Sequence, residues 1–198
     1  MRQSVYLGRD WQNLNYLARG NPEQKRAWTA LGMTKIPSNL EAFQPTLIGT
    51  LPLGFDLAVH ELYFCCQTPE LERFQKKATK AFGTRKKFRF VENWDSPQGP
   101  QSECFFEIEG FHIKIVATES PLKSQQGYLA FLTIAKLLDL GRSKLHSKIQ
   151  EHLNNGLDLM TASGQCIGIK SNYQQNLAHL ALLGITYAVE KSALAFRS

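Results

Sequence analysis

The sequence predicts an α+β fold in which helices flank a mixed β-sheet of four to five strands and the C-terminal third is helical. The chain has 198 residues, of which 43% are apolar, so it is long enough to form one domain with a full hydrophobic core. Strand-like runs lie in its middle, and residues that start and stop helices punctuate both ends. We therefore expect a single domain with a helical segment at 1–44, a sheet core at 45–122 and a helical part at 123–198.

The N-terminal segment carries helix boundaries at short intervals. Asp10 can cap a helix over 11–19, and Pro22 suits the first turn of a second helix that runs to about Leu31. A third short helix is expected at 40–43, where Pro45 ends it.

The middle of the chain alternates between strand and helix signals. A helix is predicted over 70–82, closed by Gly83. The turn Glu109-Gly110 between two alternating runs predicts a β-hairpin. The expected strands span 46–48, 56–66, 87–92, 104–108 and 111–116.

The remainder is predicted to be helical. Glycines at 141, 156, 168 and 184 separate the helical stretches. The expected helices span 125–140, 143–154, 160–167 and 173–183.

Composition excludes several classes of site. No Cys-x-x-Cys pair occurs among the four cysteines, so no zinc site is predicted, and Cys65 and Cys66 should point to opposite faces of a strand as reduced thiols. The five histidines show no metal-ligand spacing, and no nucleophile elbow is present.

The chain ends suggest a soluble protein. The first residues lack the continuous apolar run of a signal peptide, and the apolar run from Leu180 to Val189 is shorter than the about 20 residues that a bilayer requires. We therefore expect a cytoplasmic protein with no membrane partner.

Positive charge is concentrated between residues 73 and 89 of a chain whose formal net charge is +6. Such a stretch is commonly a solvated helix face and loop, but it can also hold phosphate backbones by counterion release. Arg73 begins the stretch. The candidates for phosphate or nucleic-acid binding are Lys76, Lys77, Lys80, Arg85, Lys86, Lys87 and Arg89.

A second candidate site lies between residues 49 and 114. Metal-dependent nucleotidyl transfer needs carboxylates that converge from alternate positions of one strand and from a neighbouring strand, together with a small turn that offers N–H groups to phosphate. Gly49-Thr50 can form the turn, and Glu61 and Tyr63 share one face of a predicted strand. On the last expected strand, Lys114 faces the same way as His112 and Val116.

Residues 45–183 resemble a bacterial family of unknown function in the DNA-polymerase-beta-like nucleotidyltransferase superfamily. Its pattern GT-x-P-x-x-ID, then SDLDI and a cysteine, is matched here by Gly49-Thr50-Leu51-Pro52 with Asp56, then by His60 to Phe64 and Cys65. Its hairpin ending GFPIEIF and its Gln-x-Ala-Tyr-Arg-His helix are matched by residues 110–116 and 125–130. The resemblance implies a nucleotidyltransferase-like sheet flanked by helices.

The resemblance also places substitutions at every carboxylate of the family's metal site. Glu61 and Tyr63 stand where the family has its two strand aspartates, and Lys114 stands where it has its third carboxylate. Leu129-Ala130 replaces its Arg-His, while Asp56 is unchanged. This pattern implies that the scaffold is retained and that the metal chemistry is lost, so no cofactor is expected.

Three functions remain open at this point. The leading hypothesis is a catalytically degenerate protein that binds a nucleotide, a nucleic acid or a protein partner. The alternative is an atypical metal-dependent nucleotidyltransferase in which Asp56 and Glu61 hold Mg²⁺ and Lys114 stabilises the transferred phosphate. A structural subunit of a larger assembly, anchored through Trp11, Tyr16 and Trp28, is the third.

For Lys114 we expect a salt bridge to Asp56 or Glu61, because a lysine there would replace the charge of a metal ion. A surface ion pair with Glu107, diagonal to it in the hairpin, is the other arrangement that the pattern allows.

Overall fold

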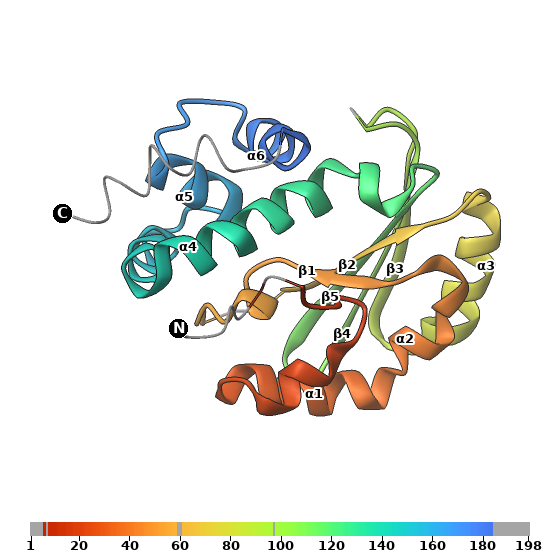
Figure 1. Cartoon of the computed structure of the whole chain (residues 1–198). Coiled ribbons are helices and arrows are strands. Elements are labelled where there is room, and N and C mark those ends of the chain that lie inside the picture. The colour runs from red at the N-terminus through yellow and green to blue at the C-terminus, as the bar shows by residue number, and fades with distance from the viewer. Residues whose placement is uncertain (1–5, 7, 59–60, 97, 184–198) are drawn as a thin grey trace. The chain divides into compact units, whose positions relative to one another are not determined.

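The protein has the predicted α+β architecture, with a five-stranded mixed sheet, flanking helices and helices toward the C-terminus (Figure 1). The computed structural model describes residues 6, 8–58, 61–96 and 98–183. The chain divides into two compact units: Asp10–Gln125, and Met1–Arg9 with Gln126–Ser198. The single domain expected from the sequence stays a prediction.

The sheet belongs to the first of these units and follows the order β1-β2-β5-β4-β3. Its central pair, β2 and β5, is parallel, and all other neighbours are antiparallel. The strands are β1 (Thr46–Ile48), β2 (Glu61–Gln67), β3 (Lys86–Asn93), β4 (Gln101–Ile108) and β5 (Phe111–Thr118).

The predicted β-hairpin is confirmed as β4 and β5. Its turn residues Glu109 and Gly110 have φ angles of 48° and 80°. Positive φ at both central residues is the conformation that two-residue hairpins favour, and glycine adopts it without steric strain. The turn fixes the register, in which Glu107 lies opposite His112 as expected.

Helix α1 (Pro22–Thr34) begins where the sequence predicts. Asn21 accepts a hydrogen bond from the Gln24 backbone N–H at 2.8 Å, and the Gln24 side chain accepts one from the Asn21 N–H at 3.0 Å. This reciprocal capping box satisfies two N–H groups that a helix start otherwise leaves unpaired. The other helices of this unit are η1 (Leu14–Arg19), α2 (Ile36–Asn39), η2 (Glu41–Phe43), η3 (Leu51–Leu53), α3 (Leu71–Phe82) and η4 (Leu122–Ser124).

Two N-terminal predictions need correction. The first helix begins at Leu14 as a 3₁₀ helix and not at Trp11, because Asn13, rather than Asp10, supplies the capping side chain. Helix α1 continues past the expected stop at Gly32 and ends at Thr34, where Lys35 adopts the left-handed conformation. An exposed glycine inside a helix weakens it by about 1 kcal/mol without ending it.

The main core lies between one face of the sheet and the layer formed by α1 and α3 (Figure 1). Phe82 of α3 stacks on Phe106 of β4, with ring centroids 4.9 Å apart. Phe74 meets Phe43 of η2 edge to face at 5.4 Å. These contacts hold α3 and η2 against the sheet.

The second unit contains α4 (Gln126–Asn154), α5 (Leu159–Cys166) and α6 (Tyr173–Leu182). The sequence predicts two helices where α4 is continuous through Gly141, so the expected break at residues 141–142 is wrong. Thr133 donates a hydrogen bond to the Leu177 carbonyl at 2.7 Å, which ties α4 to α6. Asp158 caps α5.

The four cysteines are free and buried, as the sequence predicts. Burial raises the pKa of Cys104 to about 12, and it raises the pKa of Cys66 well above its ordinary value. The thiols therefore stay protonated at neutral pH and act as apolar packing groups.

A pair of glycine substitutions tests the helical packing. A Cβ at Gly164 would lie 2.5 Å from the Tyr173 ring, whereas a Cβ at Gly32 would meet no atom within 4 Å. Gly164→Ala should therefore lower the free energy of unfolding by about 1–2 kcal/mol through overpacking. Gly32→Ala should raise it by up to about 1 kcal/mol. Urea denaturation of both variants measures the difference, and equal effects would contradict the described packing of α5 on α6.

Candidate functional site

Three of the sequence-predicted site residues, Glu61, Tyr63 and Lys114, lie on the face of the sheet that is opposite to the main core. In the parallel pair β2–β5, Glu61 lies opposite His112 and Tyr63 lies opposite Lys114. Their neighbours Leu62 and Ile113 point into the core and are at most 1% exposed. Alternation along the strands therefore places Glu61, Tyr63 and Lys114 on one face, as expected.

Lys114 pairs with a carboxylate other than the two expected. Its Nζ lies 3.5 Å from the Glu103 carboxylate of β4, so the predicted pairing with Asp56 or Glu61 is wrong. The register explains the partner: Phe105 lies opposite Lys114, which makes Glu103 a diagonal neighbour on the same face. The side chains are 28% and 15% exposed, so the pair is partly shielded from water.

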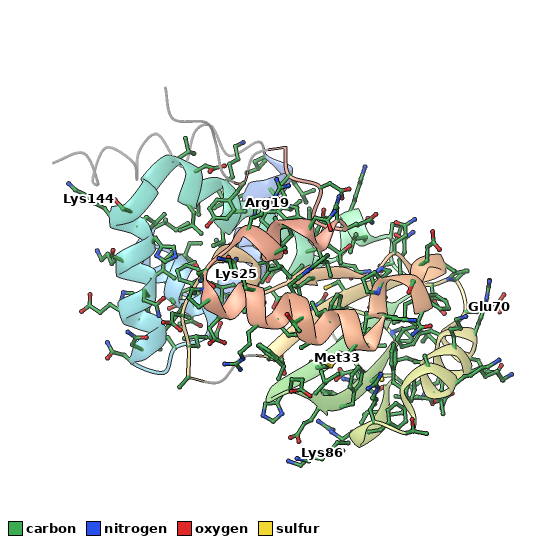
Figure 2. All side chains as sticks on the ribbon, turned by 90° about the horizontal axis from the view of Figure 1, so that it is seen from below. Arg19, Lys25, Met33, Glu70, Lys86 and Lys144 are labelled. Atoms are coloured by element: carbon green, nitrogen blue, oxygen red, sulfur yellow. The ribbon has the colours of Figure 1, made fainter. Side chains whose placement is uncertain are left out.

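The alternative partner, Glu107, is engaged by other groups. Its carboxylate lies 2.7 Å from Lys87 Nζ, 3.5 Å from Lys86 Nζ and 3.3 Å from His112 Nδ1. The hydrogen bond from Lys87 lowers the pKa of Glu107, so this residue stays ionised at neutral pH. Figure 2 shows Lys86 projecting outward from the sheet.

Tyr63 is largely shielded from solvent. Burial raises its pKa well above the ordinary value, and a hydrogen bond with Cys65 and the charges of Glu103 and Glu61 add to the effect. The Tyr63 phenol is therefore protonated at neutral pH. Burial likewise raises the pKa of Cys65 to about 12.

Asp56 and Glu61 are both exposed. The expected strand over 56–66 is shorter than predicted, because β2 begins at Glu61. β5 begins at Phe111, directly after the hairpin turn, so the parallel register leaves residues 56–58 with no β5 residue opposite them. Residues 59 and 60 lie outside the described part of the chain.

Gly49-Thr50 forms the turn that follows β1. Gly49 has a φ of 101°, a conformation that favours glycine. The Thr50 carbonyl accepts hydrogen bonds from Leu53 N–H at 3.2 Å and from Phe55 N–H at 3.3 Å. Ile48, the last residue of β1, is the register partner of Tyr63 on β2. The Gly49-Thr50 turn therefore begins one residue after this pair.

A row of alternating cations and aromatic rings crosses this face. In register order it contains Tyr63, Lys114, Phe105 and Arg89, from four adjacent strands. The Lys114 ammonium lies 5.4 Å from the Tyr63 ring centroid and 5.6 Å from that of Phe105, and the Arg89 guanidinium lies 3.7 Å from the Phe105 centroid. Sequence reasoning missed Phe105 and Glu103, which a register derived from the Glu109-Gly110 turn would have placed beside Lys114.

The basic stretch predicted as one phosphate-binding set divides into two groups. Arg73, Lys76, Lys77 and Lys80 of α3, with Ala42 and Phe43 of η2, line a pocket of about 330 Å³. The remaining cations of the stretch, on β3 and just before it, contact other residues of the protein. The Arg85 guanidinium donates to the Met33 carbonyl at 2.8 Å, Lys86 and Lys87 pair with Glu107, and Arg89 stacks on Phe105.

The described residues contain no group of three or more His, Cys, Asp or Glu side chains that could hold a metal ion. No helix in this part of the chain is both long enough and apolar enough to cross a membrane.

Comparison with known proteins identifies one family. A search among curated proteins gives no match to this chain. Residues 29–180, which include the whole sheet and the α3 pocket, match a family described as a domain of unknown function, DUF4269. Because the match spans well over half of the sequence, the chain belongs to the DUF4269 family.

Proposed function

We propose that this chain is a nucleotidyltransferase-like protein that acts by binding a nucleotide, either free or within a nucleic-acid strand, and does not catalyse metal-dependent transfer. One observation carries the proposal. The Lys114 ammonium lies beside Tyr63 and is held by Glu103, where the resembling family has its third carboxylate.

The side chains at this position do not fit a divalent cation. Hard cations such as Mg²⁺ take oxygen ligands, and converging carboxylates supply them. A lysine ammonium offers no lone pair and repels the metal, and the protonated Tyr63 phenol is a poor ligand. These side chains therefore do not support a metal-dependent catalytic step at this site.

The same face has the chemistry of metal-independent recognition. Lys114 and Arg89 supply positive charge for phosphate, and both lie against aromatic rings. Cations combined with aromatic side chains are the elements with which proteins hold nucleotides without reading their sequence. Partial burial of the Lys114–Glu103 pair strengthens its electrostatic interactions relative to those of a fully solvated pair.

Isothermal titration calorimetry with each of the four ribonucleoside triphosphates and with a short oligonucleotide, with and without MgCl₂, tests the proposal. We expect binding of at least one of these ligands, with an affinity that magnesium does not increase. Absence of binding to all of them would overturn the proposal, as would binding that requires magnesium and is followed by product formation.

Variants locate the binding on the sheet. Lys114→Gln and Arg89→Gln remove one cation each from the row and should each weaken binding by about tenfold, the loss expected for one charge-assisted contact of about 1.5 kcal/mol. Lys25→Gln removes an exposed charge from α1 and should leave affinity unchanged. Equal affinities of all three variants would place the ligand elsewhere.

A further inference from the structure

The four cations that line the α3 pocket come from a single face of this helix. Arg73, Lys76, Lys77 and Lys80 follow the spacing i, i+3, i+4 and i+7, which places their side chains side by side. The buried residues of α3, which include Phe74 and Phe82, occupy the other face and anchor the helix on the sheet. The cations are therefore presented from a rigid element.

Most of this positive charge is not neutralised by the protein. Among the described residues, the side chains of Arg73, Lys77 and Lys80 have no ion-pair or hydrogen-bond partner. Lys76 pairs with Glu72 at 2.6 Å, but their side chains are 74% and 76% exposed, so water screens the pair and a stronger anion can compete for the lysine. In contrast, the cations of β3 are held by Glu107 and Phe105.

The shape and composition of the pocket identify the class of ligand. The four cations extend over about 10 Å of helix axis at 1.5 Å per residue. A nucleic-acid strand that runs alongside would present about three phosphates over this length, at 3.4 Å each. Lysines act as point charges toward phosphate, whereas the buried part of a protein interface is depleted in lysine and enriched in aromatic residues. The apolar floor contributed by Phe43 is only 3% exposed, so it offers little surface to an acidic protein.

We propose that the α3 pocket is a sequence-independent binding site for the phosphodiester backbone of a nucleic acid, with Arg73, Lys77 and Lys80 as its main contacts. The inference does not rest on the proposed role of the cation–aromatic row. Helix α3 packs on the opposite face of the sheet, and the two sets of residues do not overlap.

Fluorescence anisotropy with labelled oligonucleotides of about 20 residues, titrated at several salt concentrations, provides the test. The parent should bind unrelated sequences with similar affinity, and log K should fall linearly with log salt. The triple variant Arg73→Gln, Lys77→Gln and Lys80→Gln should weaken binding by about tenfold or more and reduce the salt slope by about two to three. Glutamine has a helix propensity close to that of lysine and arginine, so α3 should remain folded.

A matched control separates a local site from a general effect of charge. Lys25→Gln, Lys123→Gln and Lys170→Gln remove the same charge from exposed positions outside the pocket. Figure 2 shows Lys25 on α1, away from Glu70 at the start of α3. This control should keep the parent affinity and salt slope.

The inference would be overturned by the absence of oligonucleotide binding by the parent, by parent-like binding of the α3 triple variant, or by an equal loss in both triple variants. Tighter binding of a polyglutamate peptide than of an oligonucleotide would also overturn it, in favour of an acidic protein partner. Loss of oligonucleotide binding in the α3 triple variant, together with parent-like binding by Lys114→Gln, would support the α3 site. The same result would contradict the sheet-face proposal for oligonucleotides, so the two proposals can fail separately.

Discussion

Replacing Lys114 by glutamate is expected to lower the free energy of unfolding by about 2–4 kcal/mol. The change removes the cation that pairs with Glu103 at 3.5 Å and adds a second carboxylate next to it. Loss of one partner from a fully buried pair costs about 3–5 kcal/mol, and the 28% exposure of Lys114 reduces that figure. Urea denaturation followed by circular dichroism measures the loss.

The pH dependence of stability and a control variant separate repulsion between the two carboxylates from the loss of the Lys114–Glu103 ion pair. In Lys114→Glu, repulsion between the two carboxylates raises their pKa values in the folded state above those in the unfolded state. The folded variant then binds more protons, so its stability relative to the parent should recover as pH falls from 7 toward 5. Lys114→Gln adds no anion and should lose less stability, with a weaker dependence on pH. A glutamate variant as stable as the parent at pH 7 would contradict the Lys114–Glu103 pairing.

Millimolar Mg²⁺ or Mn²⁺ should raise the melting temperature of Lys114→Glu but not that of the parent. Two neighbouring carboxylates supply oxygen ligands to a hard cation, whereas the Lys114 ammonium repels one. Lys114→Gln is the control and should show no such rise. An equal metal effect in all three proteins would show that the ions bind elsewhere.

Replacing Phe82 by alanine should lower the free energy of unfolding by about 3–5 kcal/mol, the range for a large aromatic residue removed from a core. Phe82 is fully buried and stacks on Phe106 at 4.9 Å, so the change leaves a cavity between α3 and β4. Val91→Ala is the control, because Val91 is 38% exposed and should lose no more than about 0.5 kcal/mol. A loss below about 1 kcal/mol for Phe82→Ala would contradict the packing of α3 on the sheet.

The sequence predicted those element boundaries that are determined by a capping residue or a turn residue next to them. Asn21-Pro22 begins α1, and Glu109-Gly110 closes the β4–β5 hairpin. The start of β2 could not be predicted in this way. Residues 57 and 58 look strand-like, but β5 begins only at Phe111, so no β5 residue lies opposite them. Gly141 looked like a break, yet the helix continues through it.

The candidate site was predicted in part. Period-two alternation is sufficient to place Glu61 and Tyr63 on one face, and the parallel register brings Lys114 opposite Tyr63. The partner of Lys114 follows from the register of the β4–β5 hairpin, which makes Glu103 a diagonal neighbour; alternation along each strand does not by itself specify that register. The division of the basic stretch depends on tertiary contacts such as Lys87 with Glu107, so counting charges along the chain treats all its members alike.

Incubation of the protein with labelled nucleoside triphosphates, Mg²⁺ or Mn²⁺ and candidate acceptors tests the central claim most directly. Because Lys114 and the protonated Tyr63 phenol do not suit a divalent cation, we expect no more label in any acceptor than a heat-inactivated sample gives. Metal-dependent transfer that is abolished by Asp56→Ala and by Glu61→Ala would contradict the account and establish an active nucleotidyltransferase.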